Sequence, residues 1–460
     1  MEQDRFFFSV CRLAIPVALQ SLLQASFNVI DQIMIGQLGS VDVAAVGLAG
    51  KFTGIFAVVV SAVSTIAGIM VSQYLGQRNC TEVRKSLIVN MAVALGLAVP
   101  FTILCAVFPT QIIGLYTSDE ATITASAQYM TIVAVTFLPA AGSSLFSTML
   151  RCMEKASLPL YASLIAAILN TGLNYILIFG KFDFPVMGVT GAAIATVIAQ
   201  VINFLLIFLF YWKHKNSIEA SQAVEKLGCR FNWPQYISML LPILICEFMW
   251  SLGENTYAAI YGHLGTDTTA AMMLLNPIQG LVIGALSGLS QAAGVIVGKF
   301  LGGGDRDGAF TASKKLIVYG FLAALPFSII VVLIRPWYIS IYQVDEPVKL
   351  LLRQIMVAYA LVAPFKVQNM IVGGGIIRSG GKTAYVMFID LIGTWVFGVP
   401  LGLLSAFVFH FTIPYVYLFL SLEECIRFGA SVIVLRRKKW MQSLETSEAI
   451  TIHSNRRSTV

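Results

Sequence analysis

The sequence predicts an all-α membrane protein with twelve transmembrane helices in two pseudo-symmetric six-helix lobes. Three observations predict this fold. Of the 460 residues, 57% are hydrophobic and only 12% are charged, whereas soluble domains carry about 25% charged residues. Apolar stretches of helix length recur along the whole chain, and motifs of the first half return in the second. So few charges could not cover the surface of a water-soluble protein.

The apolar stretches are each long enough to cross about 30 Å of hydrocarbon as a helix. The predicted spans cover residues 13–35, 43–75, 87–108, 124–149, 157–180, 188–212, 236–262, 268–300, 312–334, 348–376, 383–405 and 408–435. The second, eighth and tenth are longer than a bilayer requires, which predicts tilt or extension beyond it. Glu2 and Asp4 precede the first apolar residues, and no A-x-A site follows. We therefore expect a retained first helix rather than a signal peptide.

Basic residues gather in every second loop, and cytoplasmic loops are the ones that carry excess Lys and Arg. The predicted cytoplasmic positions are Arg5, Arg12, Arg78, Arg84, Lys85, Arg151, Lys155, Lys213, Lys215, Lys226, Arg230, Lys299, Arg306, Lys314, Lys315, Arg378, Lys382 and Arg436 to Lys439. The opposite loops hold only Lys181, Arg335 and Lys349. This asymmetry predicts a multi-pass protein of the inner (plasma) membrane with both termini in the cytoplasm. The net charge of +7 is then a topology signal and does not indicate a nucleic-acid partner.

The two halves repeat each other at a nearly constant shift. Pro16 corresponds to Pro242, and Gly76 corresponds to Gly302. Six spans separate each pair, so both halves insert with the same orientation and are related by an axis along the membrane normal. We expect an N-lobe at 1–212, a cytoplasmic linker at 213–232, a C-lobe at 233–440 and a cytoplasmic tail at 441–460. Rocking of the lobes would alternate access to a central cavity.

The residues that most often carry chemistry are scattered. The seven cysteines contain no C-x-x-C pair, and the four histidines are far apart in sequence. This pattern predicts no disulfide framework, no metal site and no cofactor. No nucleophile–base set is evident, so we do not expect an enzyme.

Four polar residues follow one face of the first span, namely Gln20, Gln24, Asn28 and Asp31. At about 100° per residue they form a single stripe, and Asp31 is its only charge. Polar groups within a spanning helix usually face the protein interior and mark ion or substrate sites. We expect Asp31 to bind a cation. Alternatively, Asp31 pairs with a buried base such as Lys51, or lies at the end of the helix.

The seventh span carries Glu247 and Glu254 on one face, with Trp250 and Tyr261 close to it. A carboxylate beside aromatic rings suits an organic cation through charge and cation–π contact. The alternative for Glu254 is a solvated position near the membrane interface. In span eleven, Asp390 could bind H⁺ or Na⁺, or pair with Lys366 or Arg378. Glu423 and Glu424 in the last span are adjacent and should point in different directions, one of them pairing with Arg427.

Further polar groups lie inside predicted spans. Asn170 and Asn174, one turn apart in span five, could offer amide oxygens to an ion or join two helices. The basic residues Lys51, Arg353 and Lys366 could keep nearby carboxylates ionised or extend toward the membrane surface.

Taken together, these motifs resemble the multidrug and toxic compound extrusion (MATE) family over essentially all of residues 10–440. The first half carries Pro16, Asp31-x-x-Met34-x-Gly36, Leu38-Gly39, Ala44 to Ala49, Leu150-Arg151, Asn170, Leu173-Asn174-Tyr175, Gly180 and Gly188 to Thr196. The second half resembles a bacterial branch, through Glu247-Phe-Met-Trp250-Ser-Leu-Gly253 and Ile389-Asp390 followed by Trp395 and Pro400.

The resemblance implies efflux of organic cations or drugs by a monomer in exchange for H⁺ or Na⁺. The family's first-helix aspartate falls on Asp31, and its seventh-helix glutamate lies between Glu247 and Glu254. Some members carry an acid in span five where this sequence has Asn174. Others have an aspartate in span ten, where this chain has none, so that Asp390 becomes the candidate. The alternative is a flippase for lipid-linked sugars or another lipid-like substrate, which would favour a large basic cavity. A membrane-embedded enzyme and a passive channel are more distant alternatives.

Overall fold

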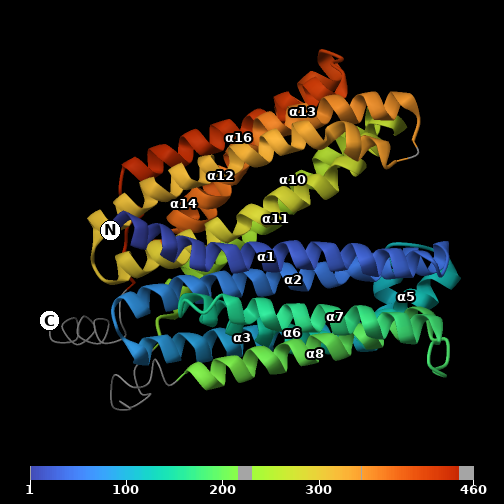
Figure 1. Ribbon diagram of the computed structural model, residues 1–460, viewed down its shortest axis with the longest axis horizontal. Helices are drawn as coiled ribbons and strands as arrows, with labels where there is room; N and C mark the ends of the chain where they lie inside the picture. Colours follow the sequence, from blue (N-terminus) through green and yellow to red (C-terminus); the bar gives the residue numbers. More distant parts are fainter. Residues whose placement is uncertain (1, 216–230, 343, 445–460) are drawn as a thin grey trace. The chain divides into compact units, whose positions relative to one another are not determined.

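The computed structural model describes residues 2–215, 231–342 and 344–444, and these residues are almost entirely helical, without a β-strand. Figure 1 follows α1 to α8 from blue to green and α10 to α16 from yellow-green to red. The predicted all-α fold is confirmed. The predicted linker lies largely outside the described residues, with Lys226 and Arg230, as does the tail beyond residue 444.

The helices of the first half follow the predicted spans. Their bounds are α1 (Glu2–Gly36), α2 (Ser40–Gly76), α3 (Cys80–Val107), α4 (Pro109–Gly114), α5 (Glu120–Val133), α6 (Phe137–Cys152), α7 (Ser157–Phe179) and α8 (Gly188–His214). The fourth predicted span comprises α5 and α6, which are joined by a 3₁₀ turn, η1 (Ala134–Thr136). Pro139 follows this turn. Because proline has no N–H to continue the ladder of α-helical hydrogen bonds, the helix is irregular here.

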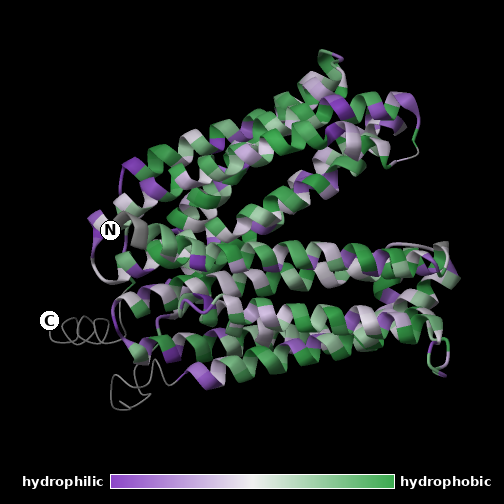
Figure 2. Cartoon of the chain, viewed as in Figure 1, coloured by the Kyte–Doolittle hydropathy of each residue, from purple (hydrophilic) through white to green (hydrophobic). Residues whose placement is uncertain are grey.

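The second half has longer and less regular helices. Their bounds are α10 (Trp233–His263), α11 (Thr266–Gly302), α12 (Arg306–Ser340), α13 (Glu346–Asn369), α14 (Thr383–Leu391), α15 (Val399–Leu403) and α16 (Ile413–Arg436). Among the described residues, eleven helical segments are long and apolar enough to cross a membrane. Segment α16 is the twelfth long helical segment within the described ranges, and it carries Glu423, Glu424 and Arg427. Figure 2 shows apolar residues along the helices and many hydrophilic residues at their ends.

Many helices extend beyond the predicted apolar spans. Helix α12 covers Arg306–Ser340, whereas hydropathy predicts 312–334. The polar first turns belong to the same helix because Asp305 caps it, accepting a hydrogen bond from the Gly308 N–H at 2.7 Å. Hydropathy locates the apolar part of a helix, whereas the cap determines where the helix begins.

Three π-helical segments interrupt the tenth and eleventh spans, at η2 (Met370–Ile377), η3 (Ile392–Gly398) and η4 (Leu404–Val408). No sequence signal predicted them. Segment η2 contains Gly373 to Gly375, and a Cβ at Gly375 would meet the Ser290 carbonyl oxygen of α11 at 2.5 Å. Pro400 follows η3 and lacks the N–H that a regular helix needs. Two of the π-helical segments thus contain a run of glycines or precede a proline, and both features are known to make helices irregular.

The described residues form two compact units. Unit 1 is drawn from Met1–Ala18, Ser72–Arg78 and Asn232–Val460, and unit 2 from Leu19–Val71 and Asn79–Phe231. Helices α1 and α2 therefore each contribute to both units. The predicted bounds of the lobes, linker and tail stay a prediction.

Within unit 1, the repeat is visible as a reciprocal contact between the last turns of α2 and α11. A Cβ at Gly76 would overlap the Lys299 carbonyl oxygen, and one at Gly302 would overlap the Gln73 carbonyl oxygen. Gly76 corresponds to Gly302 in the repeat, and Gln73 corresponds to Lys299. Each half thus supplies the same glycine at the same backbone contact. The absence of a side chain permits this close approach.

The last described residues pack against helices of unit 1, to which they belong. Trp440 is fully buried, and the Leu444 N–H donates to the Gln73 side-chain oxygen at 2.7 Å. The Gln73 amide in turn donates to the Ser379 carbonyl at 2.6 Å. The segment from Trp440 to Leu444 is thereby fixed to the end of α2, which is itself joined to the residues that follow η2.

Candidate functional site

Asp31 of α1 lies against two asparagines of α7 within unit 2. The Asn174 side-chain amide donates to Asp31 Oδ1 at 2.8 Å. In the orientation that satisfies its own amide, Asn170 donates to the two Asp31 oxygens at 3.0 and 3.1 Å. The two asparagines are one helical turn apart, so both amides face the same carboxylate. The structure thus brings together three of the predicted site residues.

The charge of Asp31 is met by amides and not by a base. Among the described residues, no cationic group lies within 4.0 Å of this carboxylate, and Lys51 is exposed. The predicted alternative of a pair with Lys51 is therefore wrong. Asn174 is buried at 1% exposure, whereas Asp31 is partly accessible. A carboxylate held only by neutral donors keeps its charge available to an incoming cation.

The rest of the polar stripe on α1 divides into two parts. Gln20 donates to the Ser163 hydroxyl at 2.7 Å and accepts from Arg151 at 3.2 Å, and thus joins α1 to α6 and α7. Gln24 and Asn28 are exposed.

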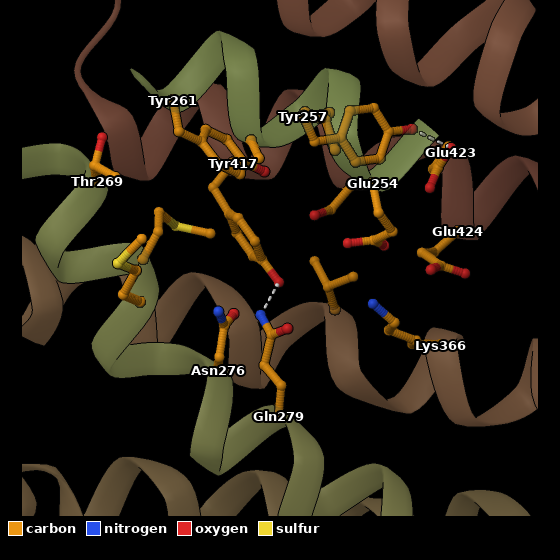
Figure 3. Close-up of a pocket in the computed structure, with 16 residues that line it drawn as sticks. Glu254, Tyr257, Tyr261, Thr269, Asn276, Gln279, Lys366, Tyr417, Glu423 and Glu424 are labelled. Atoms are coloured by element: carbon orange, nitrogen blue, oxygen red, sulfur yellow. Dashed lines mark hydrogen bonds between the residues drawn. The ribbon is translucent and has the colours of Figure 1, made fainter. Parts of the chain in front are cut away.

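Unit 1 contains a polar cavity of about 200 Å³. Its lining residues come from α10, α11, α13 and α16, and Figure 3 shows their side chains pointing into it. Its polar lining comprises Glu254, Tyr257 and Tyr261 of α10, Thr269, Asn276 and Gln279 of α11, Lys366 of α13, and Tyr417, Ser421, Glu423 and Glu424 of α16. Glu254 is exposed and borders the cavity.

Hydrogen bonds fix the side of this cavity that α16 forms. The Tyr257 hydroxyl donates to Glu423 Oε2 at 2.7 Å, and the Asn369 amide donates to Glu424 Oε2 at 2.7 Å. Gln279 donates to the Tyr417 hydroxyl at 3.1 Å. Both glutamates of α16 are thereby fixed by neutral donors as well as by charge.

Arg427 is the basic residue behind that side of the cavity. It donates from Nε (3.0 Å) and Nη2 to the same Asp390 oxygen. Its Nη1 lies 3.5 Å from Glu424 and 4.0 Å from Glu423. The predicted alternative that Asp390 pairs with Lys366 or Arg378 is therefore wrong. Both glutamates lie by Arg427, so the prediction that only one of them pairs with it is wrong. They precede Arg427 by three and four residues, which places all three on one helix face.

Glu247 and Glu254 share a face of α10 but have different surroundings. Glu247 pairs with Arg378 at 3.4 Å. Beside it, the Cys246 thiol donates to Asp390 Oδ2 at 2.9 Å. Trp250 is 48% exposed and, with Asp390, lines a small void of about 10 Å³. Glu254 therefore borders the large cavity, while Glu247 and Trp250 lie near the Asp390 cluster.

Sequence reasoning did not assign a role to Tyr257, Gln279 or Tyr417, nor place Lys366 in a cavity. Tyrosines are common in apolar spans, so these gave no distinct signal. The run Glu423-Glu424-x-x-Arg427 did give one, because three ionisable residues within one turn of a spanning helix are costly unless they meet partners.

The family model described as MatE matches the chain twice, over residues 16–176 and 242–404. The chain belongs to the MatE family. The two matches begin at the repeated prolines, Pro16 and Pro242. They therefore coincide with the two halves of the repeat in this sequence.

Several MATE relatives match over most of their length. The chain is 27% identical over 420 residues to a probable multidrug resistance protein NorM of Agrobacterium fabrum, covering 87% of each chain. It is 25% identical over 455 residues to human multidrug and toxin extrusion protein 1, covering 97% of this chain and 78% of the relative. An outward-facing multidrug resistance MATE family transporter superposes with a TM-score of 0.82 at 18% identity, covering 94% and 96% of the two chains. This likeness shows that the MATE fold extends over nearly the whole chain.

Proposed function

We propose that this protein is a secondary active antiporter that exports organic cations or drugs in exchange for H⁺ or Na⁺. Membership of the MatE family and the names of its relatives, which describe multidrug resistance and toxin extrusion, support export of small molecules. The observation that carries the exchange is the Asp31 carboxylate, which is held by Asn170 and Asn174 and has no basic partner among the described residues. Such a group suits a small cation that binds and leaves.

Competition for carboxylates would couple the two fluxes. An ion entering from outside binds Asp31 or a C-lobe carboxylate and weakens binding of the organic cation, which is released. The lobes then rock, the ion leaves to the cytoplasm, and substrate binds again. An ion drives this cycle only if it binds the two states with unequal affinity. Because linkage is reciprocal, substrate must weaken ion binding by the same factor.

The location and oligomeric state of the protein are part of this proposal. The protein acts as a monomer in the inner (plasma) membrane with both termini in the cytoplasm, so that substrate enters from the side of the basic loops. No cofactor is needed, because the ion gradient supplies the free energy.

The test uses purified protein in liposomes loaded with a fluorescent cationic dye. A pH gradient and a Na⁺ gradient are imposed separately, and dye movement is recorded for the native protein and for Asp31→Asn. We expect one gradient to accelerate dye movement and Asp31→Asn to abolish this acceleration. Glu346→Gln is the control, because Glu346 is 85% exposed and pairs with Lys349, also near the start of α13; this variant should behave like the native protein.

Other results would contradict the proposal. Full coupling in a well-folded Asp31→Asn variant would remove Asp31 from the ion path. Equal dye movement with and without a gradient would indicate a passive channel. If neither gradient moved dye, the flippase alternative would gain support, although the acidic and aromatic lining of the unit 1 cavity does not suit an anionic lipid-linked sugar.

A further inference from the structure

Lys366 is a cation built into the wall of the unit 1 cavity. Figure 3 shows its ammonium pointing toward the carboxylate of Glu254, with the carboxylate of Glu424 to one side. Among the described residues, no carboxylate oxygen lies within 4.0 Å of this ammonium. Lys366 thus faces two carboxylates across the cavity without closing an ion pair to either.

The three carboxylates of the cavity differ in how many partners they have. Glu423 and Glu424 accept hydrogen bonds from Tyr257 and Asn369 and lie by Arg427. Glu254 makes no ion pair within the described part of the chain. When ionised, the cavity lining carries three carboxylates, Glu254, Glu423 and Glu424, against the single ammonium of Lys366. Arg427 behind this wall also pairs with Asp390, so an excess of negative charge is left. The cavity therefore attracts a further cation.

The size and walls of the cavity restrict that cation. Its volume is about 200 Å³, and a cavity of about 150 Å³ holds benzene. Tyr257, Tyr261 and Tyr417 line it together with Met272 and Met273. Aromatic faces bind cations, and methionine adapts to flat apolar groups. The lining suits a flat monocation of one or two rings.

We propose that Lys366 is a resident competitor of the transported cation in this cavity. The inference rests on the proposed export of organic cations and adds a residue that sets their affinity. In the empty cavity, the Lys366 ammonium partly neutralises Glu254 and Glu424. A bound cation lies between these carboxylates and Lys366, so the two positive charges repel each other at short range. The flexible lysine stem allows the ammonium to withdraw and return, and its return favours release.

The test is a binding titration of the purified full-length protein with 1-methyl-4-phenylpyridinium, a flat two-ring monocation, by isothermal calorimetry. We compare the native protein with Lys366→Met, which keeps the length of the side chain and removes its charge. We expect the Kd of Lys366→Met to fall about tenfold, because a like charge is removed from a partly buried site. Lys314→Met is the control. It removes an exposed ammonium that lies over Phe310 on α12, and it should leave the Kd unchanged.

A double variant tests whether the competition is for Glu254. In a Glu254→Gln background, Lys366→Met should tighten binding much less, because the carboxylate shared by the two cations is gone. An unchanged or higher Kd in a well-folded Lys366→Met protein would overturn the proposal. So would the absence of binding in every variant.

Transport separates this inference from the proposed function. At saturating dye, Lys366→Met should bind more tightly yet export more slowly in liposomes, because release is retarded. If the native protein binds the pyridinium cation but neither gradient drives dye, antiport fails while the competition stands. If antiport proceeds and Lys366→Met binds no more tightly, the competition fails alone.

Discussion

At the residue scale, Arg427 is the point at which three carboxylates meet. Its side chain is 12% exposed, and Asp390, Glu423 and Glu424 lie around it. Breaking a buried ion pair by removing one partner is costly because the other charge stays desolvated and unpaired. Here one base serves three acids, so its loss leaves several groups uncompensated.

Replacing Arg427 by methionine should therefore destabilise the protein by about 3–5 kcal/mol. The measurement is thermal unfolding of the purified protein followed by tryptophan fluorescence. The control is Lys438→Met, because Lys438 is 50% exposed and pairs with Asp307 at 3.5 Å, and exposed pairs contribute about 0–1 kcal/mol. An Arg427→Met protein that unfolds at the native temperature would show that these acids do not depend on Arg427.

At the scale of the element, close contacts between helices in unit 1 depend on glycines at the points of contact. Gly76 and Gly302 let the last turns of α2 and α11 approach until backbone meets backbone. The π-helical segments have a related origin, since η2 lies against α11 at Gly375. Regular hydrophobic patterning predicts that these helices exist, whereas their irregular turns depend on particular glycines and prolines.

The substitution Gly302→Ala should destabilise unit 1 by about 1–3 kcal/mol, the usual cost of overpacking, because the Gln73 carbonyl occupies the space of the new methyl group. Gly47→Ala on α2 is the matched control, since nothing lies within 4 Å of its Cβ position. That change should be neutral or stabilising by up to about 1 kcal/mol. The fraction of monomer that survives heating, measured by size-exclusion chromatography, reports both effects. Equal survival of the two variants would contradict the close contact.

At the scale of the whole molecule, the distribution of basic residues predicts the orientation. The turn between α11 and α12 is flanked by Lys299 and Arg306, whereas the connection from α7 to α8 carries Lys181 as its only basic residue. Basic loops stay in the cytoplasm. The two connections should therefore lie on opposite sides of the membrane.

Labelling of single cysteines tests this orientation in intact cells. In a variant without native cysteines, Phe182→Cys, at a side chain that is 78% exposed, should react with an impermeant maleimide added outside. Asp307→Cys, at a side chain that is 96% exposed, should react only after the cells are permeabilised. The reverse pattern would invert the proposed topology and, with it, the direction of export.

The sequence by itself determined the helical class, the repeat and the family, because these depend on local hydrophobicity and on motifs repeated along the chain. It also singled out Asp31, Glu254 and Asp390, since a charge in an apolar span is rare and conspicuous. Only the tertiary structure decided which side chains these charged residues contact. Helical periodicity gives the face of a residue but not the neighbouring helix, so Arg427 could not be matched to Asp390 across 37 positions. For the same reason, the cavity that Lys366 shares with three tyrosines became visible only once four helices were packed together.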